Sequence, residues 1–277
     1  MSQPVEISFE FFPPKTPHGQ EKLRAVRDEL AELSPSFFSV TDGAGGSTQE
    51  RTFNTVMEMS ETGIKIAPHL ACIGCSTDNL KDLLNKYKEK GIDRIIAVRG
   101  DLPSGMGAPG EFRYANDLIE FIRKETGDHF YLDVAAYPET HPQADSFEDD
   151  LRNFKKKVDA GANSAITQYF YNPDAYFHFA DRCQQLGIDI PIIPGVMPIT
   201  NYSNLVRFSE SCGAEIPRWL RRQLESYRDD SASIRQLGEE VVSRLCERLI
   251  AGGAPSLHIY TLNQVEPNKA ICKNLGL

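Results

Sequence analysis

The alternation of strand-like and helix-like segments constrains the fold of this chain most. Eight short runs rich in Val, Ile, Phe and Tyr are each followed by a stretch whose apolar residues have helical spacing. The strand runs lie at 5–11, 37–41, 65–72, 94–99, 131–137, 164–169, 190–196 and 256–262. The helical stretches lie at 21–33, 49–62, 79–88, 115–124, 147–160, 175–185, from 202 onward and at 268–274. Strands that alternate with helices of this length are parallel and are joined by helical crossovers.

Eight such units in 277 residues favour a single (β/α)8 TIM barrel of the α/β class. A doubly wound sheet is the alternative, but no strand is followed by G-x-G-x-x-G, and the G-x-G at 105–107 lies in a long loop. The stretch 216–252 predicts extra helix before the last strand, as an insertion or an oligomer contact. We therefore expect one catalytic domain over residues 1–277.

Charge and composition narrow the functional classes. The formal net charge of −9 argues against nucleic acid or an anionic membrane as a partner, so small-molecule substrates are expected. An uncharged apolar run of 18 residues and a basic, apolar leader are both missing from the sequence, which predicts a cytoplasmic protein without membrane spans. Reduced thiols are then expected, and Cys72 and Cys75 are interpreted as buried or incidental.

Polar residues gather where the predicted strands end. A barrel enzyme carries its chemistry at the carboxyl ends of its strands. The residues at these ends are Glu10, Thr41, His69, Arg99 with Asp101, Tyr137, Gln168, and Tyr260 with Asn263. This near-complete ring predicts an active site at that rim.

Glu10 is the first candidate for proton transfer. It lies between Phe9 and Phe11, and a carboxylate in such a setting is expected to be desolvated, which raises its pKa. The alternative is a glutamate that points outward and pairs with a basic residue on a helix, a role for which Glu6 is the better candidate.

Two other rim positions allow two interpretations each. In Arg99-Gly100-Asp101, the glycine lets a ligand approach the backbone, or the flanking charges form a structural ion pair. A single histidine such as His69 is more often a satisfied structural residue than a ligand. Because no other residue has convincing metal-ligand spacing with it, no metal is predicted.

The helix expected at 147–160 has a polar stripe of Asp150, Asn153 and Lys157 beside its apolar stripe. This stripe is either a solvated face or a surface that holds ribose through Asp and Asn and diphosphate through Lys156 or Lys157. Just before it, the segment 135–142 combines small residues with Tyr137 and His141, which suits a flat ring or a tight turn.

Short motifs recur in order from about residue 5 to residue 275. They are SFEFFPPK (8–15), SVT (39–41), APHL (67–70), AVRGD (97–101), AAYPETHP (135–142), DAGAN (159–163), ITQYF (166–170), PGVMP (194–198) and YTLN (260–263). This set closely resembles the methylenetetrahydrofolate reductases. The length is similar to that of the short bacterial form, which has the catalytic barrel alone.

The resemblance implies a flavoprotein. In this family, NADH or NADPH gives hydride to FAD, and the reduced flavin then converts 5,10-methylenetetrahydrofolate to 5-methyltetrahydrofolate in a ping-pong cycle that supplies methyl groups for methionine synthesis. Glu10 matches the general acid, and Asp101 matches an aspartate beside the flavin and the folate. The resemblance also implies a homo-oligomer.

The resemblance assigns binding residues as well. For FAD and the nicotinamide path they are Thr41, Asp42, Ala44, His69, Arg99, Gly100, Asp101, Tyr114, Ala115, Tyr137, His141, Ala144, Asp150, Asn153, Lys156 and Lys157. For folate they are Glu10, Asp101, Gln168, Asn204, Phe208 and Gln264. Asp42 stands where a tyrosine is common, and Gln264 stands where an arginine that pairs with the glutamate tail is common.

Two other classes remain open at this point. One is a flavin-binding subunit that takes electrons from a partner protein. The other is a non-redox barrel, such as a lyase that uses Glu10 and Lys15.

Overall fold

The computed structural model describes residues 5–42, 49–100 and 110–277. Its strands are β1 (Glu6–Phe11), β2 (Phe37–Val40), β3 (Ile66–Ala71), β4 (Arg94–Val98), β5 (Tyr131–Ala136), β6 (Ser164–Thr167), β7 (Ile192–Ile193), β8 (Gly195–Val196) and β9 (Ser256–Tyr260). Its helices are α1 (Pro17–Ala31), α2 (Gln49–Ser60), α3 (Thr77–Glu89), α4 (Ala115–Thr126), α5 (Phe147–Asp159), α6 (Pro173–Gln185), α7 (Tyr202–Cys212), α8 (Arg218–Tyr227), α9 (Ser231–Ala251) and α10 (Glu266–Asn274). Ala44 and Asp101, both predicted site residues, lie outside the described residues.

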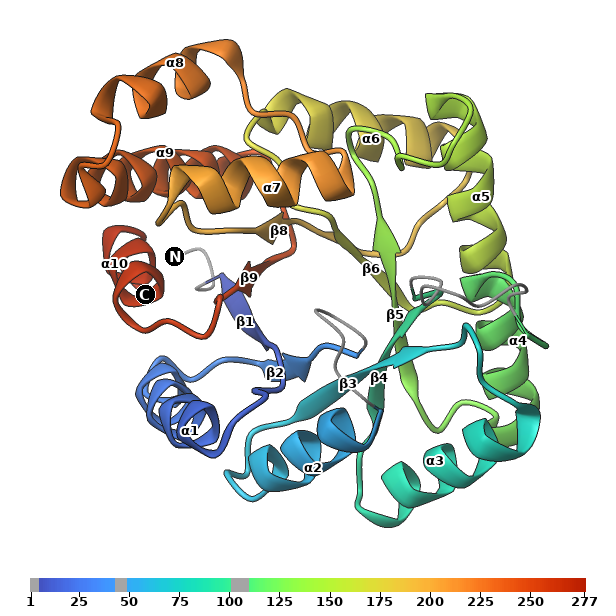
Figure 1. Cartoon of the computed structure of the whole chain (residues 1–277). Coiled ribbons are helices and arrows are strands. Elements are labelled where there is room, and N and C mark those ends of the chain that lie inside the picture. Colours follow the sequence, from blue (N-terminus) through green and yellow to red (C-terminus); the bar gives the residue numbers. More distant parts are fainter. Residues whose placement is uncertain (1–4, 43–48, 101–109) are drawn as a thin grey trace.

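The strands form one parallel sheet that curls into a barrel with the helices around it (Figure 1). Their order is β7-β6-β5-β4-β3-β2-β1-β9-β8, and every recorded pairing is parallel. β7 pairs with β6, and β8 pairs with β9. Since only Pro194 separates β7 from β8, the two are one strand that bridges both edges of the sheet. The predicted eight-unit TIM barrel is confirmed.

The predicted strand at 190–196 is interrupted at Pro194, because proline has no N–H to give to a neighbouring strand. The junction is held instead by other groups: the Gly195 N–H donates to Thr167 Oγ1 at 2.9 Å, and the Tyr260 hydroxyl donates to the Thr167 carbonyl at 2.6 Å. A Cβ on Gly195 would lie 2.1 Å from that carbonyl oxygen. Glycine is therefore required where the barrel closes.

The helices differ from the expected ones mainly at their ends. α1 begins at Pro17 rather than near Glu21, because the Thr16 side chain accepts from the Gly19 N–H and proline suits a first helical turn. α5 begins where Ser146 caps the Asp149 N–H. Between α7 and β9 the chain forms α8 and α9, which confirms the extra helix before the last strand.

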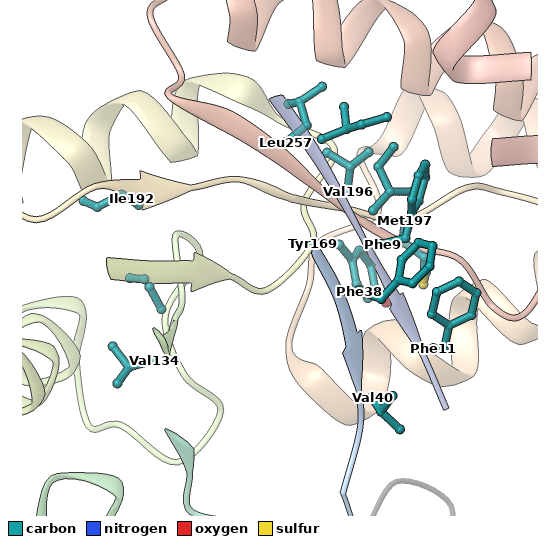
Figure 2. Packing of buried hydrophobic residues seen from close by; sticks show 14 of the residues in the cluster. Phe9, Phe11, Phe38, Val40, Val134, Tyr169, Ile192, Val196, Met197 and Leu257 are labelled. Atoms are coloured by element: carbon teal, nitrogen blue, oxygen red, sulfur yellow. The ribbon is translucent and has the colours of Figure 1, made fainter. Parts of the chain in front are cut away.

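The apolar core has two parts. The larger part lies between the strands and the helices, and in it Phe38 packs against Phe9 and Phe11 at ring distances of 6.4 and 5.1 Å (Figure 2). The smaller part joins five different strands inside the barrel through Phe37, Ala67, Ile96, Ile166 and Ile193. Because successive side chains of a strand face opposite ways, Ser8 and Glu10 of β1 face this lumen while Phe9 and Phe11 face outward.

The described helices include none that is both long enough and apolar enough to cross a membrane.

Candidate active site

Glu10 lies at the carboxyl end of β1 between two imidazole rings. Its Oε2 is 3.0 Å from Nε2 of His69 on β3 and 3.5 Å from Nε2 of His258 on β9. The His69 contact is the closer of the two and is an ion-pair contact when the imidazole is protonated. The side chains of Glu10 and His69 are 15% and 14% exposed, whereas His258 is fully buried. Three strands therefore place one carboxylate and two imidazoles at the rim.

The expected rise in the pKa of Glu10 is wrong. Burial does raise it, but His69 and His258 act in the opposite direction through their charge and hydrogen bonds and lower the pKa to about 2. The aromatic neighbours that suggested an apolar setting, Phe9 and Phe11, are on the other face of the strand. Without ligands, the Glu10 carboxylate is thus ionised at neutral pH.

The backbone of Glu10 is fixed by the end of β9. Both the N–H and the hydroxyl of Thr261 donate to the Glu10 carbonyl, at 3.1 and 2.6 Å. Asn263 exchanges two hydrogen bonds with the backbone of Phe12, at 3.1 and 2.9 Å. Leu262 and Asn263 both have positive φ, which bends the chain sharply enough for these contacts. The YTLN motif therefore positions Glu10.

A cavity of about 700 Å³ opens at the carboxyl ends of β4 and β5. Its lining includes Arg99, Gly100, Tyr114, Ala115, Tyr137, His141, Ala144, Asp150, Asn153, Lys156 and Lys157, all predicted for FAD. The polar stripe of α5 is thus one wall of a cavity rather than only a solvated face. The volume is in the range of cofactor sites.

Lys157 carries a half-buried positive charge into this cavity. Its Nζ donates to the Ala135 carbonyl at 2.5 Å, and Asp150 is near enough to affect its titration. Burial lowers the pKa of Lys157 to about 8, against a smaller opposing effect of Asp150. Lys156, one residue earlier, is exposed and donates to Asn153 at 2.8 Å. An anionic group in the cavity would meet both ammonium groups.

Asp150 also shapes the loop between β5 and α5. Its Oδ2 accepts from the His141 N–H at 2.9 Å, and burial is the main cause that raises its pKa. In the same loop, Thr140 has a φ of 75°, a strained conformation for a β-branched residue, and the rings of Tyr137 and His141 meet edge to face at 4.5 Å. These contacts hold the loop in one conformation, in which Tyr137 and His141 line the cavity.

Gly100 lines the cavity, and close packing also requires a glycine at this position. Its φ is 83°, and a Cβ would lie 2.9 Å from the Ala71 side chain and 3.2 Å from that of Ile73. The glycine therefore allows the ends of β3 and β4 to pack closely. Arg99 Nε donates to the Gly100 carbonyl at 3.3 Å. Its predicted companion, Asp101, is outside the described residues.

Thr41 and Asp42 follow β2 and do not line the cavity. The Thr41 hydroxyl oxygen is buried and has no hydrogen-bond partner in the described part of the chain. Asp42 accepts from the Ala71 N–H at 3.2 Å and from the Thr52 hydroxyl at 3.3 Å. Asp42 therefore links the end of β3 to α2. The Thr41 hydroxyl remains available to bind a ligand at the end of β2.

Four of the residues predicted for folate, Gln168, Asn204, Phe208 and Gln264, do not line the cavity. Gln168 follows β6, is half-buried and accepts from the Tyr169 N–H at 3.0 Å. On α7, Asn204 is exposed, and Phe208 is half-buried with the Arg207 guanidinium 5.0 Å from its ring. Gln264 follows β9, and its carbonyl accepts from Asn268 at 2.6 Å. They come from the β6–β9 half of the rim, whereas the cavity belongs to β4 and β5.

Sequence reasoning missed His258, Ser8 and Ser39. They lie below the rim, and Ser8 and His258 are register partners on β1 and β9. The sequence signal for them was strand alternation, because side chains two residues apart on a strand face the same side. His258 is two residues before Tyr260, and Ser8 is two residues before Glu10, so all four face the lumen. Groups of three or more metal-ligating side chains placed to hold an ion are not found in the described ranges.

The described residues fit a flavin nucleotide. The α5 wall of the cavity offers the ammonium groups of Lys156 and Lys157 to a diphosphate, beside the carboxylates of Asp149 and Asp150. Outside the cavity lining, the buried Thr41 Oγ1 has no hydrogen-bond partner in the described part of the protein. Such atoms are costly to bury unless a ligand satisfies them.

Comparison with known proteins decides the family. The family profile for methylenetetrahydrofolate reductase matches residues 2–276. The chain belongs to the methylenetetrahydrofolate reductase family. It is 41% identical to the Escherichia coli protein named 5,10-methylenetetrahydrofolate reductase, over 99% of this chain and 91% of that one. It is 38% identical to the Arabidopsis thaliana protein named methylenetetrahydrofolate reductase (NADH) 1, over 98% of this chain and 48% of that one.

A solved structure shares the fold. A Clostridium thermocellum protein, described as binding two copies of 5-methyl-5,6,7,8-tetrahydrofolic acid, superposes with a TM-score of 0.70 at 18% identity. The alignment covers 99% of this chain and 95% of the other. This likeness supports the barrel architecture.

Proposed function

We propose that the protein is a flavoenzyme that reduces 5,10-methylenetetrahydrofolate to 5-methyltetrahydrofolate, with NADH or NADPH as hydride donor. FAD would alternate between the two substrates in a ping-pong cycle, and the product would supply methyl groups for methionine synthesis. Family membership supports the reaction class. The names of the plant relatives favour NADH as donor.

The observation that carries the proposal is that the cavity and Glu10 lie at the same rim of the barrel, where the strands have their carboxyl ends. The cavity's α5 wall offers Lys156 and Lys157 to a diphosphate, and Asp150 with Asn153 to a ribose. Glu10 stands farther along the same rim, at the end of β1. Ligands at the carboxyl ends of barrel strands meet residues from several strands at once.

Bound FAD would supply two-electron transfer between nicotinamide and folate. The chain's own residues would do the rest. Lys157 would compensate the diphosphate charge, and the 137–144 loop would hold the ring system through Tyr137 and His141. Glu10 would give a proton to the folate nitrogen that leaves when the methylene bridge opens. The ionised state of Glu10 means that this proton must come from a neighbouring group or from water.

Anaerobic stopped-flow spectroscopy tests this proposal. The purified protein is expected to be yellow, to lose its flavin absorbance on mixing with NADH, and to regain it on mixing with methylenetetrahydrofolate. A colourless protein that binds no FAD would refute the flavoenzyme and point to a non-redox barrel. A flavin that NADH and NADPH both fail to reduce would point to a subunit fed by a partner protein.

A further inference from the structure

Glu139 joins two parts of the rim that are 76 positions apart in the sequence. It belongs to the loop between β5 and α5, and its Oε2 accepts a hydrogen bond from the Glu215 backbone N–H at 2.7 Å. Glu215 lies just beyond α7, the helix that carries Asn204 and Phe208, both predicted for folate. One side chain therefore links the loop that lines the cavity with the helix that carries predicted folate residues.

The end of α7 also packs directly against this loop. Gly213 follows the helix with a φ of 76°, and a Cβ there would lie 2.9 Å from Pro142 Cγ and 3.7 Å from the Thr140 carbonyl oxygen. Glycine allows this close approach because it has no side chain and adopts a positive φ without strain. Two neighbouring contacts thus hold the loop against α7, one through the Glu139 carboxyl group and one through the Gly213 backbone.

A third contact joins α7 to the segment after β6. The Tyr169 hydroxyl and Ser209 Oγ lie 3.0 Å apart, and both residues are buried. Tyr169 follows Gln168, another residue predicted for folate, and its N–H donates to the Gln168 side chain at 3.0 Å. The carboxyl-terminal half of α7 therefore contacts two other segments that carry predicted site residues.

The setting of Glu139 is unfavourable for a charged carboxylate. The residue is half-buried, and burial raises its pKa to about 7, while the Glu215 N–H acts in the opposite direction. The ionised form is thus less stable in the folded protein than in water. A glutamate that served only solubility would be exposed, so the burial favours a specific role for the hydrogen bond to Glu215.

We propose that Glu139 is a positioning residue that holds the β5–α5 loop against α7 and thereby aligns the cofactor-binding loop with the predicted folate residues. This inference rests on the proposed function. Glu139 is not among the described residues that line the cavity, so it acts through Tyr137 and His141, which do line it. On the other side of the bond, a shift of α7 would move Phe208, so loss of the bond affects both halves of the rim.

The test compares Glu139→Ala and Glu139→Gln with the wild type. Alanine removes the acceptor, whereas the amide oxygen of glutamine can still accept from the Glu215 N–H. In Glu139→Ala, we expect a rise of about five- to tenfold in two values, as for the loss of one hydrogen bond. The first is the Kd for FAD, and the second is the methylenetetrahydrofolate concentration that half-saturates flavin reoxidation.

The limiting rates should behave differently. With FAD saturating, the rate of flavin reduction by NADH and the limiting rate of reoxidation should stay within twofold of the wild type in Glu139→Ala. Glu139→Gln should stay within twofold in every measurement. This split between affinity and limiting rate, with rescue by glutamine, is what distinguishes a positioning residue from a catalytic one.

Matched variants separate this role from general destabilisation. Glu215→Ala keeps the backbone N–H and should leave all of these values unchanged. Gly213→Ala tests the contact independently of Glu139, because its Cβ would crowd Pro142, and it should raise the same two values. Gly187→Ala, at a similar φ of 68° but with open space around its Cβ, should raise neither.

Unchanged FAD affinity and folate half-saturation in Glu139→Ala would overturn the positioning role, and so would equal losses in Glu139→Ala and Glu139→Gln. A lower Tm with wild-type affinities would also overturn it, because it would show a merely structural residue. The FAD affinity comes from titration of flavin fluorescence and needs no turnover. If the wild type binds FAD but forms no 5-methyltetrahydrofolate, the proposed function is what fails, and the FAD titrations still decide the role of Glu139.

Discussion

Replacing Lys157 by methionine should stabilise the protein without FAD and weaken its hold on FAD. Methionine matches the length of lysine but carries no charge. In the folded protein the pKa of Lys157 is about 8 against an ordinary value of 10.5. At 1.36 kcal/mol per pKa unit, this difference means that the charged form costs up to about 3 kcal/mol of stability. Partial exposure and the lost bond to Ala135 reduce the expected gain to roughly 1–2 kcal/mol.

The pH dependence of this stability gain follows from proton linkage. Because the folded-state pKa is lower than the unfolded one, the folded protein binds fewer protons between pH 8 and 10.5, and wild-type stability rises with pH across that window. The advantage of Lys157→Met should therefore be full below pH 8 and vanish toward pH 10.5. A gain of 1–2 kcal/mol in a chain of this size corresponds to roughly 2–6 °C in Tm.

The assay has two arms. Thermal unfolding of the FAD-free protein at several pH values measures the stability gain. Titration with FAD measures affinity, which should fall roughly 10- to 100-fold, because a charge-assisted bond to phosphate is worth about 1.5–3 kcal/mol. Lys155→Met is the control, since Lys155 pairs with Asp159 at 2.7 Å outside the cavity lining. Unchanged FAD affinity in Lys157→Met, or a lower Tm without FAD, would refute the reasoning.

Other predictions concern the rim and the barrel closure. Glu10→Gln should keep flavin reduction by NADH and slow folate-dependent reoxidation by about 100-fold or more. Glu6→Gln, at the opposite end of β1, is the control and should slow neither half-reaction. A near-normal rate of folate-dependent reoxidation in stopped-flow traces of Glu10→Gln would contradict this prediction. Gly195→Ala should lower the free energy of unfolding by on the order of 3 kcal/mol in urea titrations, because its Cβ would meet the Thr167 carbonyl. Gly187→Ala, whose Cβ would meet open space at a φ of 68°, should cost only about 1 kcal/mol, and equal losses in the two variants would contradict the steric argument.

The order of strands and helices could be predicted from the sequence because each unit carries its own local signals. Apolar periodicity and caps such as Ser146 act within a few residues. The break at Pro194 was present in the sequence, but the bonds that replace it join Gly195, Thr167 and Tyr260, which are far apart in the chain. Pairing of this kind depends on closure of the barrel.

The candidate site could be predicted only where its residues follow a local pattern in the sequence. The polar stripe of α5 is a local pattern, so its lysines could be found, although only the fold shows that a cavity lies beside them. The environment of Glu10 was misjudged because the neighbours in sequence, Phe9 and Phe11, are not its neighbours in space. His258, which together with His69 lowers the pKa of Glu10, is 248 positions away.

A single-turnover experiment tests the central claim most directly. The protein is reduced anaerobically with NADH, freed of nicotinamide by gel filtration, and mixed with methylenetetrahydrofolate. The account predicts one 5-methyltetrahydrofolate formed per bound FAD, because the two substrates act in turn at one site. Product that forms only when nicotinamide and folate are present together, or not at all, would contradict it.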